Sequence, residues 1–174
     1  MARKHYKPKI ITLDTETIGL DGDLRRIAIY DGKEVTYGFT FRDIEWKLEE
    51  FYKDGFLPEI YIHNADFDLR KMPEIFELGN VLWNTTRKIG NRYAKLTCKH
   101  YTIHDSMKIF PKSLATLSKD FDLEHGKLDL WEAVQDRYPG QYKDHVDFLA
   151  HCDLNDDLYL EYLGYDVISL YELI

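Results

Sequence analysis

The segment IITLDTETIGL, residues 10–20, constrains the chain most because it joins a run of β-forming residues to two carboxylates. Side chains alternate between the faces of a strand, so Asp14 and Glu16 lie on one face and Thr15 on the other. Two like charges that face one point favour a cation between them, and Mg²⁺ and Mn²⁺ prefer oxygen ligands. The segment therefore predicts a strand that ends in a cation site, although an isolated Asp-x-Glu pair is more often a solvated strand end.

Size and composition fit one folded unit. The chain has 174 residues, of which 44% are hydrophobic, so we expect a single domain over residues 1–174. Asp and Glu outnumber Lys and Arg by 31 to 23, which gives a net charge of -8. This balance argues against a protein that binds nucleic acid through a broad basic surface. It leaves room for a small acidic site that reaches phosphate through bound cations.

The cysteines and the N-terminus indicate the compartment. The two cysteines, Cys98 and Cys152, form no CxxC motif, so ordinary buried thiols in a reducing compartment are expected. The basic N-terminus MARKHYKPKI precedes no long apolar stretch, and no segment approaches the length of a membrane span. We therefore expect a soluble cytoplasmic protein without a membrane partner, located in the host cytoplasm if a phage encodes it.

Local patterns in the first two thirds of the chain alternate between strands and helices. A β-rich run over 9–15 is followed by a hairpin over 25–41 around Asp31-Gly32, and then by a helix that Gly55 ends. A strand over 59–64 leads into a helix over 65–79 that Pro73 interrupts or starts. Further strands are expected near 80–86 and 92–104, and the order predicts an α/β domain, a mixed sheet flanked by helices.

The last third is less uniform. Residues 111–142 are expected to form short helices and loops. A C-terminal helix follows the capping residues Asp153 and Asn155, and Tyr162 and Asp166 share one face of it because they are four residues apart. The tryptophans Trp46, Trp83 and Trp131 are expected to pack inside the domain.

Three acidic motifs follow one another along the chain. They are Asp14-x-Glu16, Asn64-x-x-Phe67-Asp68 and Tyr162-x-x-x-Asp166. In this order and spacing they resemble the 3'-5' exonuclease domain of DnaQ-like nucleases, in the DEDDy subclass that has a tyrosine before the final aspartate. The resemblance spans residues 14–166 and implies an RNase H-like, DnaQ-like exonuclease fold.

A narrower resemblance is to the proofreading exonuclease domain of protein-primed, family B phage DNA polymerases. The segment YIHNADFD is similar to the second motif of that group, and HDSMKIF around Ser106 resembles its Ser-Leu motif, with Met107 in place of the usual Leu. The group also has a basic residue in the next segment, for which Lys127 is the candidate. A DNA polymerase domain and a primer terminal protein are the partners that this resemblance implies.

The resemblance implies a cofactor and a role for each catalytic residue. Phosphodiester hydrolysis by two divalent cations, Mg²⁺ or Mn²⁺, about 4 Å apart is the expected chemistry. Asp14 would bridge the two cations, Glu16 and Asp166 would complete the site of the attacking water, and Asp68 would hold the second cation mainly through water. Tyr162 would orient the water, because a phenol with an ordinary pKa near 10 is a poor base at neutral pH.

Substrate contacts are implied in the same way. Phe67 would insert between the last two bases of a single strand, because such strands are bound by stacking and by contacts to phosphate and sugar. The other expected contacts to the 3' end are made by Thr17, Tyr61, His63, Asn64, Ser106 and Lys127. Outside this motif context, Tyr61 and Phe67 read as core aromatics and His63 as a structural histidine.

The sequence is compatible with three functions. The first is a metal-dependent 3'-5' exonuclease that acts on single-stranded DNA ends, either as a proofreading domain or on its own. The second is an oligoribonuclease-like enzyme that degrades RNA from its 3' end, which would need a contact to the ribose 2'-OH. The third is a nucleic-acid-binding or interaction module that keeps the fold without catalysis. The presence of all four acids and Tyr162 favours an enzyme.

Overall fold

A seven-stranded mixed sheet forms the centre of the protein. The computed structural model describes residues 5–19, 21–126 and 128–174. The strand order across the sheet is β3-β2-β1-β4-β7-β6-β5. β1, β4 and β7 run parallel, and the other neighbours pair antiparallel. The strands are β1 (Lys7–Thr17), β2 (Leu24–Tyr30), β3 (Val35–Gly38), β4 (Phe56–Ile62), β5 (Arg87–Ile89), β6 (Arg92–Thr97) and β7 (Thr102–Asp105).

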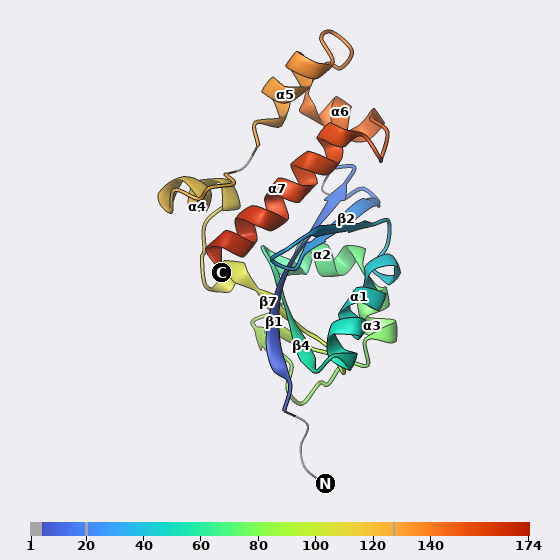
Figure 1. Ribbon diagram of the computed structural model, residues 1–174, viewed down its shortest axis with the longest axis vertical. Coiled ribbons are helices and arrows are strands. Elements are labelled where there is room, and N and C mark those ends of the chain that lie inside the picture. Colours follow the sequence, from blue (N-terminus) through green and yellow to red (C-terminus); the bar gives the residue numbers. More distant parts are fainter. Residues whose placement is uncertain (1–4, 20, 127) are drawn as a thin grey trace.

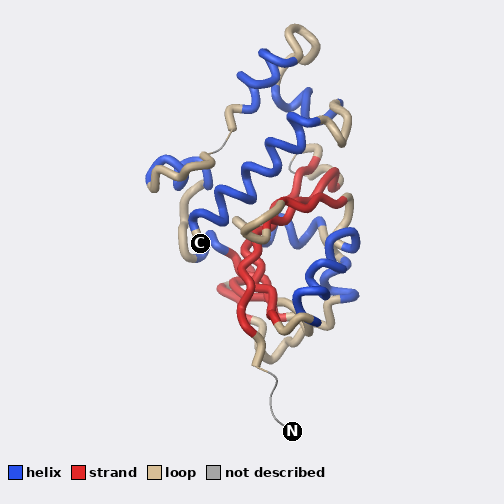
Figure 2. Tube along the Cα trace, viewed as in Figure 1, coloured by secondary structure: helices blue, strands red, loops and turns tan. Residues whose placement is uncertain are grey.

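Helices cover both faces of this sheet. The long helix α7 packs on β1 and β2 from one side, and α1, α2 and α3 lie on the other side (Figures 1 and 2). None of the helices in the described ranges has the length and apolar character needed to cross a bilayer. The helices are α1 (Arg42–Lys53), α2 (Ala65–Lys71), α3 (Glu74–Leu78), η1 (Ser106–Lys108), α4 (Leu114–Asp120), α5 (Leu130–Arg137), α6 (His145–His151) and α7 (Asp157–Leu173).

The side chains of β1 alternate between two different environments. Ile11 and Leu13 are fully buried in the main core, which also contains residues of α1 and α2. Thr12 points the other way, and its hydroxyl donates to the carbonyl oxygen of Val167 in α7, 2.6 Å away. Because alternate residues share a face, Asp14 and Glu16 are directed to the α7 side of the sheet, and the two acids share a face as the sequence predicts.

β1 is longer than the parallel strand beside it. Its pairing with β4 stops at Leu13 opposite Ile62, whereas its pairing with β2 continues through Glu16 opposite Arg26. The last four residues of β1 therefore have an open edge on the β4 side, where the chain turns from β4 into α2.

α7 packs closely against the first hairpin. The Tyr37 hydroxyl of β3 donates to the carbonyl oxygen of Leu160, 2.8 Å away. A Cβ atom at Gly164 would lie 2.8 Å from the same hydroxyl oxygen, so this position favours glycine. Asp156 caps the helix by accepting from the amides of Leu158 and Tyr159, so the predicted caps Asp153 and Asn155 are wrong by a few residues.

Most of the predicted elements are confirmed, with three corrections. The hairpin, the helix before Gly55, the break at Pro73 and the C-terminal helix are all present, and Cys98 and Cys152 are buried free thiols. The strand expected over 80–86 is wrong, because that segment makes turns and the strand begins at Arg87. The expected strand over 92–104 is two strands, and Trp46 and Trp83 are exposed rather than packed.

Asp31 holds together the turn between β2 and β3. Its Oδ1 accepts from the amides of Lys33 and Glu34, at 2.9 and 3.1 Å, and its Oδ2 lies 3.5 Å from the buried ammonium of Lys47. Burial alone would raise the pKa of this carboxyl, but the two amides and the ammonium together hold the pKa below its ordinary value of 3.8. The ionised form is therefore favoured in the folded state.

We predict that Asp31→Asn lowers the free energy of unfolding by about 1–2 kcal/mol at neutral pH, because the charge of the hydrogen-bond acceptor is lost. A carboxyl whose pKa is lowered by folding stabilises the protein above its unfolded pKa and loses that effect as the pH falls through its folded pKa. The difference between the two proteins should thus persist down to about pH 4 and shrink below it.

Urea unfolding measured across that pH range checks this prediction. Glu34→Gln is the matched control, because Glu34 also contacts Lys47 but its side chain is 70% exposed. A loss that does not change with pH would assign the effect of Asp31→Asn to shape rather than to charge.

Candidate active site

The carboxyl ends of three parallel strands meet at one pocket. β1 ends at Thr17, β4 at Ile62 and β7 at Asp105, and open α/β sheets place ligand sites at this edge. The pocket has a volume of about 710 Å³. Its lining includes the open end of β1 and residues that follow β4 and β7, together with parts of α4, α6 and α7.

Three of the four predicted acids lie together in this pocket. Asp14 and Glu16 come from β1 and Asp166 from α7, and one carboxylate oxygen of each lies within 4.8 Å of the others. Asp166 is buried, and the two β1 acids are half-buried. Three carboxylates at this spacing are a hard oxygen donor set, which fits Mg²⁺ or Mn²⁺.

Asp68 lines the same pocket but stands outside the group of three. It is 2% exposed, and its Oδ1 accepts from the Thr15 hydroxyl at 2.6 Å. Burial raises the pKa of Asp68 to about 7, although the hydrogen bonds from Thr15 act in the opposite direction. A nearby cation favours the ionised form of such a carboxyl, so this acid also suits a cation site.

Tyr162 lies one turn before Asp166 on α7 and also lines the pocket. Burial raises the pKa of its phenol well above the ordinary value, and the neighbouring carboxylates of Asp166 and Glu16 raise it further. The phenol is thus held in its protonated form, which is able to donate a hydrogen bond.

Asp105 stabilises the turn that orients α2 relative to the pocket. Its Oδ1 accepts from the amides of Asn64, Ala65 and Met107 at 3.1, 3.3 and 3.1 Å. Asn64 adopts a left-handed conformation, with φ 66° and ψ 51°, which asparagine tolerates better than most residues. This sharp turn between β4 and α2 directs Phe67 into the pocket.

His63 connects the end of β4 to the segment before α4. Its Nδ1 lies 2.9 Å from the Ser106 hydroxyl, and its Nε2–H donates to the carbonyl oxygen of Lys112 at 2.8 Å. Ser106 is fully buried, and its hydroxyl oxygen also lies 3.2 Å from the carbonyl oxygen of Ile62. The serine thus contacts both His63 and the end of β4.

The predicted substrate residues divide into three sets. Thr17, His63, Asn64 and Phe67 line the pocket. Tyr61 and Ser106 do not belong to its lining, and the Tyr61 ring stacks on His104 with 4.9 Å between centroids. Lys127 lies outside the described residues.

α6 forms a wall of the pocket that the sequence patterns did not predict. His145, Val146 and Leu149 of this helix line the pocket together with the acids. Arg25 of β2 holds the helix in place by donating to the carbonyl oxygens of Leu149 and Cys152. Asp144 caps the helix by accepting from the amide of Asp147, and an aspartate before HVDFLAH is the signal that could have found it.

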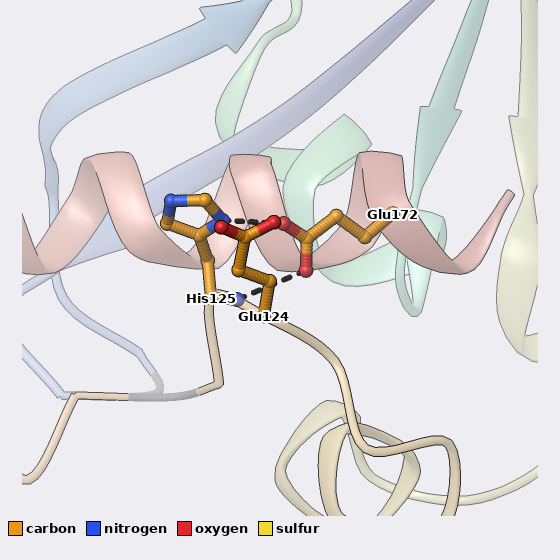
Figure 3. A group of neighbouring side chains, drawn as sticks. All are labelled: Glu124, His125 and Glu172. Carbon is orange, nitrogen blue, oxygen red and sulfur yellow. Dashed lines mark hydrogen bonds and ion pairs between the residues drawn. The ribbon is translucent and has the colours of Figure 1, made fainter.

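A second group of possible ligands, Glu124, His125 and Glu172, lies away from the pocket (Figure 3). The His125 Nδ1 and amide both contact the Glu172 carboxylate, and the Ser169 hydroxyl donates to the His125 carbonyl oxygen. These contacts tie the segment after α4 to the end of α7. We therefore interpret this group as a clamp between two segments of the chain.

Comparisons with known proteins find a similarity of structure, without a match in sequence-based searches. No protein-family profile and no curated protein matches the sequence. Among solved structures, Phi29 DNA polymerase complexed with single-stranded DNA matches with a TM-score of 0.58 and 14% identity over 94% of this chain. The ternary complex of that polymerase with primer-template DNA and incoming nucleotides matches with a TM-score of 0.57 and 17% identity over 97%.

At these identities the likeness establishes the fold alone. The α/β architecture, with its mixed sheet flanked by helices, is shared with part of the polymerase chain. This chain spans 30% of the length of the polymerase chains that it matches.

We predict that Mn²⁺ stabilises the protein through the three-acid group. A cation that binds only the folded state raises the free energy of unfolding by about 2.7 kcal/mol at about 100 times its Kd. Thermal unfolding followed by circular dichroism measures this gain. It should be lost in Asp14→Asn and kept in Glu172→Gln, which removes a charge from the clamp of Figure 3 instead. Equal stabilisation of wild type and Asp14→Asn would contradict the assignment.

Proposed function

We propose that this chain is a 3'-5' exonuclease of the DnaQ-like class, in the tyrosine subclass, which removes nucleotides from the 3' ends of single-stranded DNA. The observation that carries the proposal is the group of Asp14, Glu16 and Asp166, brought from the two ends of the chain to within 4.8 Å of one another. Phe67 and Tyr162 line the same pocket, as the motif resemblance implies. Residues 1–174 would act as one exonuclease domain.

The fold supports DNA as the substrate. The Phi29 DNA polymerase structures with this fold were solved with single-stranded DNA and with primer-template DNA. The sequence motifs resemble the proofreading domain of protein-primed phage polymerases, so a polymerase domain and a terminal protein are the proposed partners. An acidic chain with net charge -8 would bind a DNA end through the cations rather than through a broad basic surface.

The residues of the pocket have distinct proposed tasks. Asp14, Glu16 and Asp166 would hold two divalent cations, and Asp68 would hold one of them through water. When bound, such cations supply an activated water and stabilise the charge on the phosphorus centre and on the departing 3' oxygen. Tyr162, kept protonated by burial and by the neighbouring carboxylates, would donate a hydrogen bond that orients this water.

The substrate end would be positioned by the turn after β4. Phe67 would stack between the last two bases, and the backbone near Asn64 and the ring of His63 would contact sugar and phosphate. His63 is held by Ser106 and by the Lys112 carbonyl, so it would meet the substrate in a fixed orientation. This rigidity supports precise placement of the scissile bond.

We predict that the purified chain shortens a single-stranded DNA oligomer labelled at its 5' end, with Mg²⁺ or Mn²⁺ and not with EDTA. Asp14→Ala or Asp166→Ala should slow cleavage by about 1000-fold, which corresponds to about 4 kcal/mol of barrier. Product ladders on denaturing gels measure the rate.

A double variant that cleaves at the wild-type rate would refute the assignment, as would binding of the DNA end without cleavage in Mn²⁺. Faster cleavage of a matched RNA oligomer would make RNA the substrate.

Tyr162→Phe separates orientation of the water from binding of the cations. We expect kcat to fall by about 10- to 100-fold, because one hydrogen bond of the transition state is lost. The stabilisation by Mn²⁺ should match that of the wild type, since the phenol is not a ligand in this scheme. A variant that loses the Mn²⁺ effect would instead make Tyr162 part of the cation site.

A further inference from the structure

A second pocket lies on the far side of α2. It has a volume of about 530 Å³ and is bounded by α2, the start of α3 and the turn between β5 and β6. Phe76 and Tyr93 form an aromatic wall, with 5.8 Å between their ring centroids. Arg70, Asn91 and Arg92 contribute the polar part of the lining, so we name it the Arg70–Arg92 pocket.

The charge of this pocket is opposite to that of the whole chain. Asp66 is the one acid among the described residues that line it, and it is engaged by Arg92 at 3.6 Å and by the Tyr93 amide at 3.1 Å. Arg70 adds a second guanidinium, and the Lys88 ammonium lies 4.3 Å from the centroid of the Tyr93 ring. In a chain with net charge -8, this local excess of cations indicates an anionic ligand.

α2 connects this pocket to the candidate active site. Successive residues of a helix are about 100° apart, so the pair Asp66 and Arg70 faces about 130° away from the pair Phe67 and Asp68. The first pair lines the Arg70–Arg92 pocket, and the second pair lines the pocket of the acids. Lys71 lies on the same face as Phe67 and Asp68, and its ammonium is 5.7 Å from the centroid of the Phe67 ring.

An aromatic wall beside guanidinium groups suits a nucleotide. Bases stack on aromatic side chains regardless of sequence, and arginine binds the phosphates of a single strand. The exposed Arg70 stands where a strand would pass from one pocket to the other over α2. These features together favour a piece of nucleic acid over a small inorganic anion, because the latter needs no aromatic wall.

We propose that the Arg70–Arg92 pocket binds a nucleotide of the single DNA strand whose 3' end lies at the three-acid group. This proposal rests on the proposed exonuclease function. The base stacks on Tyr93, and a phosphate binds Arg70 and Arg92. A helix is about 10–12 Å wide and stacked nucleotides rise by about 3.4 Å each, so the bound nucleotide is about the third or fourth from the 3' end.

The test compares the wild type with the double variant Arg70→Ala/Arg92→Ala on substrates of different length. For an oligomer of about 20 nucleotides, we expect KM to rise about 10-fold with kcat unchanged, because only remote binding is lost. A dinucleotide is too short to reach the pocket, so the wild type and the variant should cleave it equally. Lys53→Ala is the matched control, since it removes an exposed cation of α1.

Binding measured without cleavage separates this proposal from the exonuclease function. Fluorescence anisotropy in EDTA should show weaker binding of the long oligomer by the double variant, with a salt dependence smaller by about one or two phosphate contacts. A wild type that binds but never cleaves would overturn the exonuclease function, while this difference in binding would still support the pocket. An equal loss at every length, or no loss at any length, would overturn the pocket proposal.

Discussion

The side chains of the central strand β1 alternate between two different partners: the core beneath α1 and α2 on one face, and α7 on the other. Ile11 and Leu13 fill the core beneath α1 and α2, while Thr12 on the other face donates to the backbone of α7. The same alternation continues past the last pair with β4, where Thr15 holds Asp68 while Asp14 and Glu16 meet Asp166. The packing of the domain and the placement of its acids therefore depend on one register, and neither can shift without the other.

Most residues that line the site belong to the sheet or to helices. Asp105 at the end of β7 binds three backbone amides and so fixes the turn into α2. Tyr37 holds α7 against the hairpin at Gly164, and Arg25 holds α6 against β2. Three elements that line the pocket, α2, α7 and α6, are thus attached to the sheet by buried or half-buried hydrogen bonds. Such attachment limits the movement of the acids before substrate arrives, which favours a preorganised site.

Local sequence patterns predicted the parts of this molecule that depend on local chemistry. Strand alternation placed Asp14 and Glu16, and helical spacing placed Tyr162 beside Asp166. The strand expected over 80–86 failed because its residues turn instead and the strand begins only at Arg87. α6 was missed because a seven-residue helix has little periodicity, and its place in the pocket depends on the distant Arg25. Trp46 and Trp83 are exposed, which shows that aromatic size alone does not predict burial.

Because β1 extends beyond β4, the length of this strand determines where its two acids lie relative to Asp166. One residue inserted before Asp14 would move the two acids of β1 to the α2 face of the sheet and direct Thr15 towards α7. Two inserted residues would restore the face but carry the acids about 7 Å farther along the strand, away from Asp166. Insertion of one residue and insertion of two residues in this strand are therefore both incompatible with the site. Surface loops generally tolerate insertions, whereas the distance from the core of β1 to its acids has to stay constant.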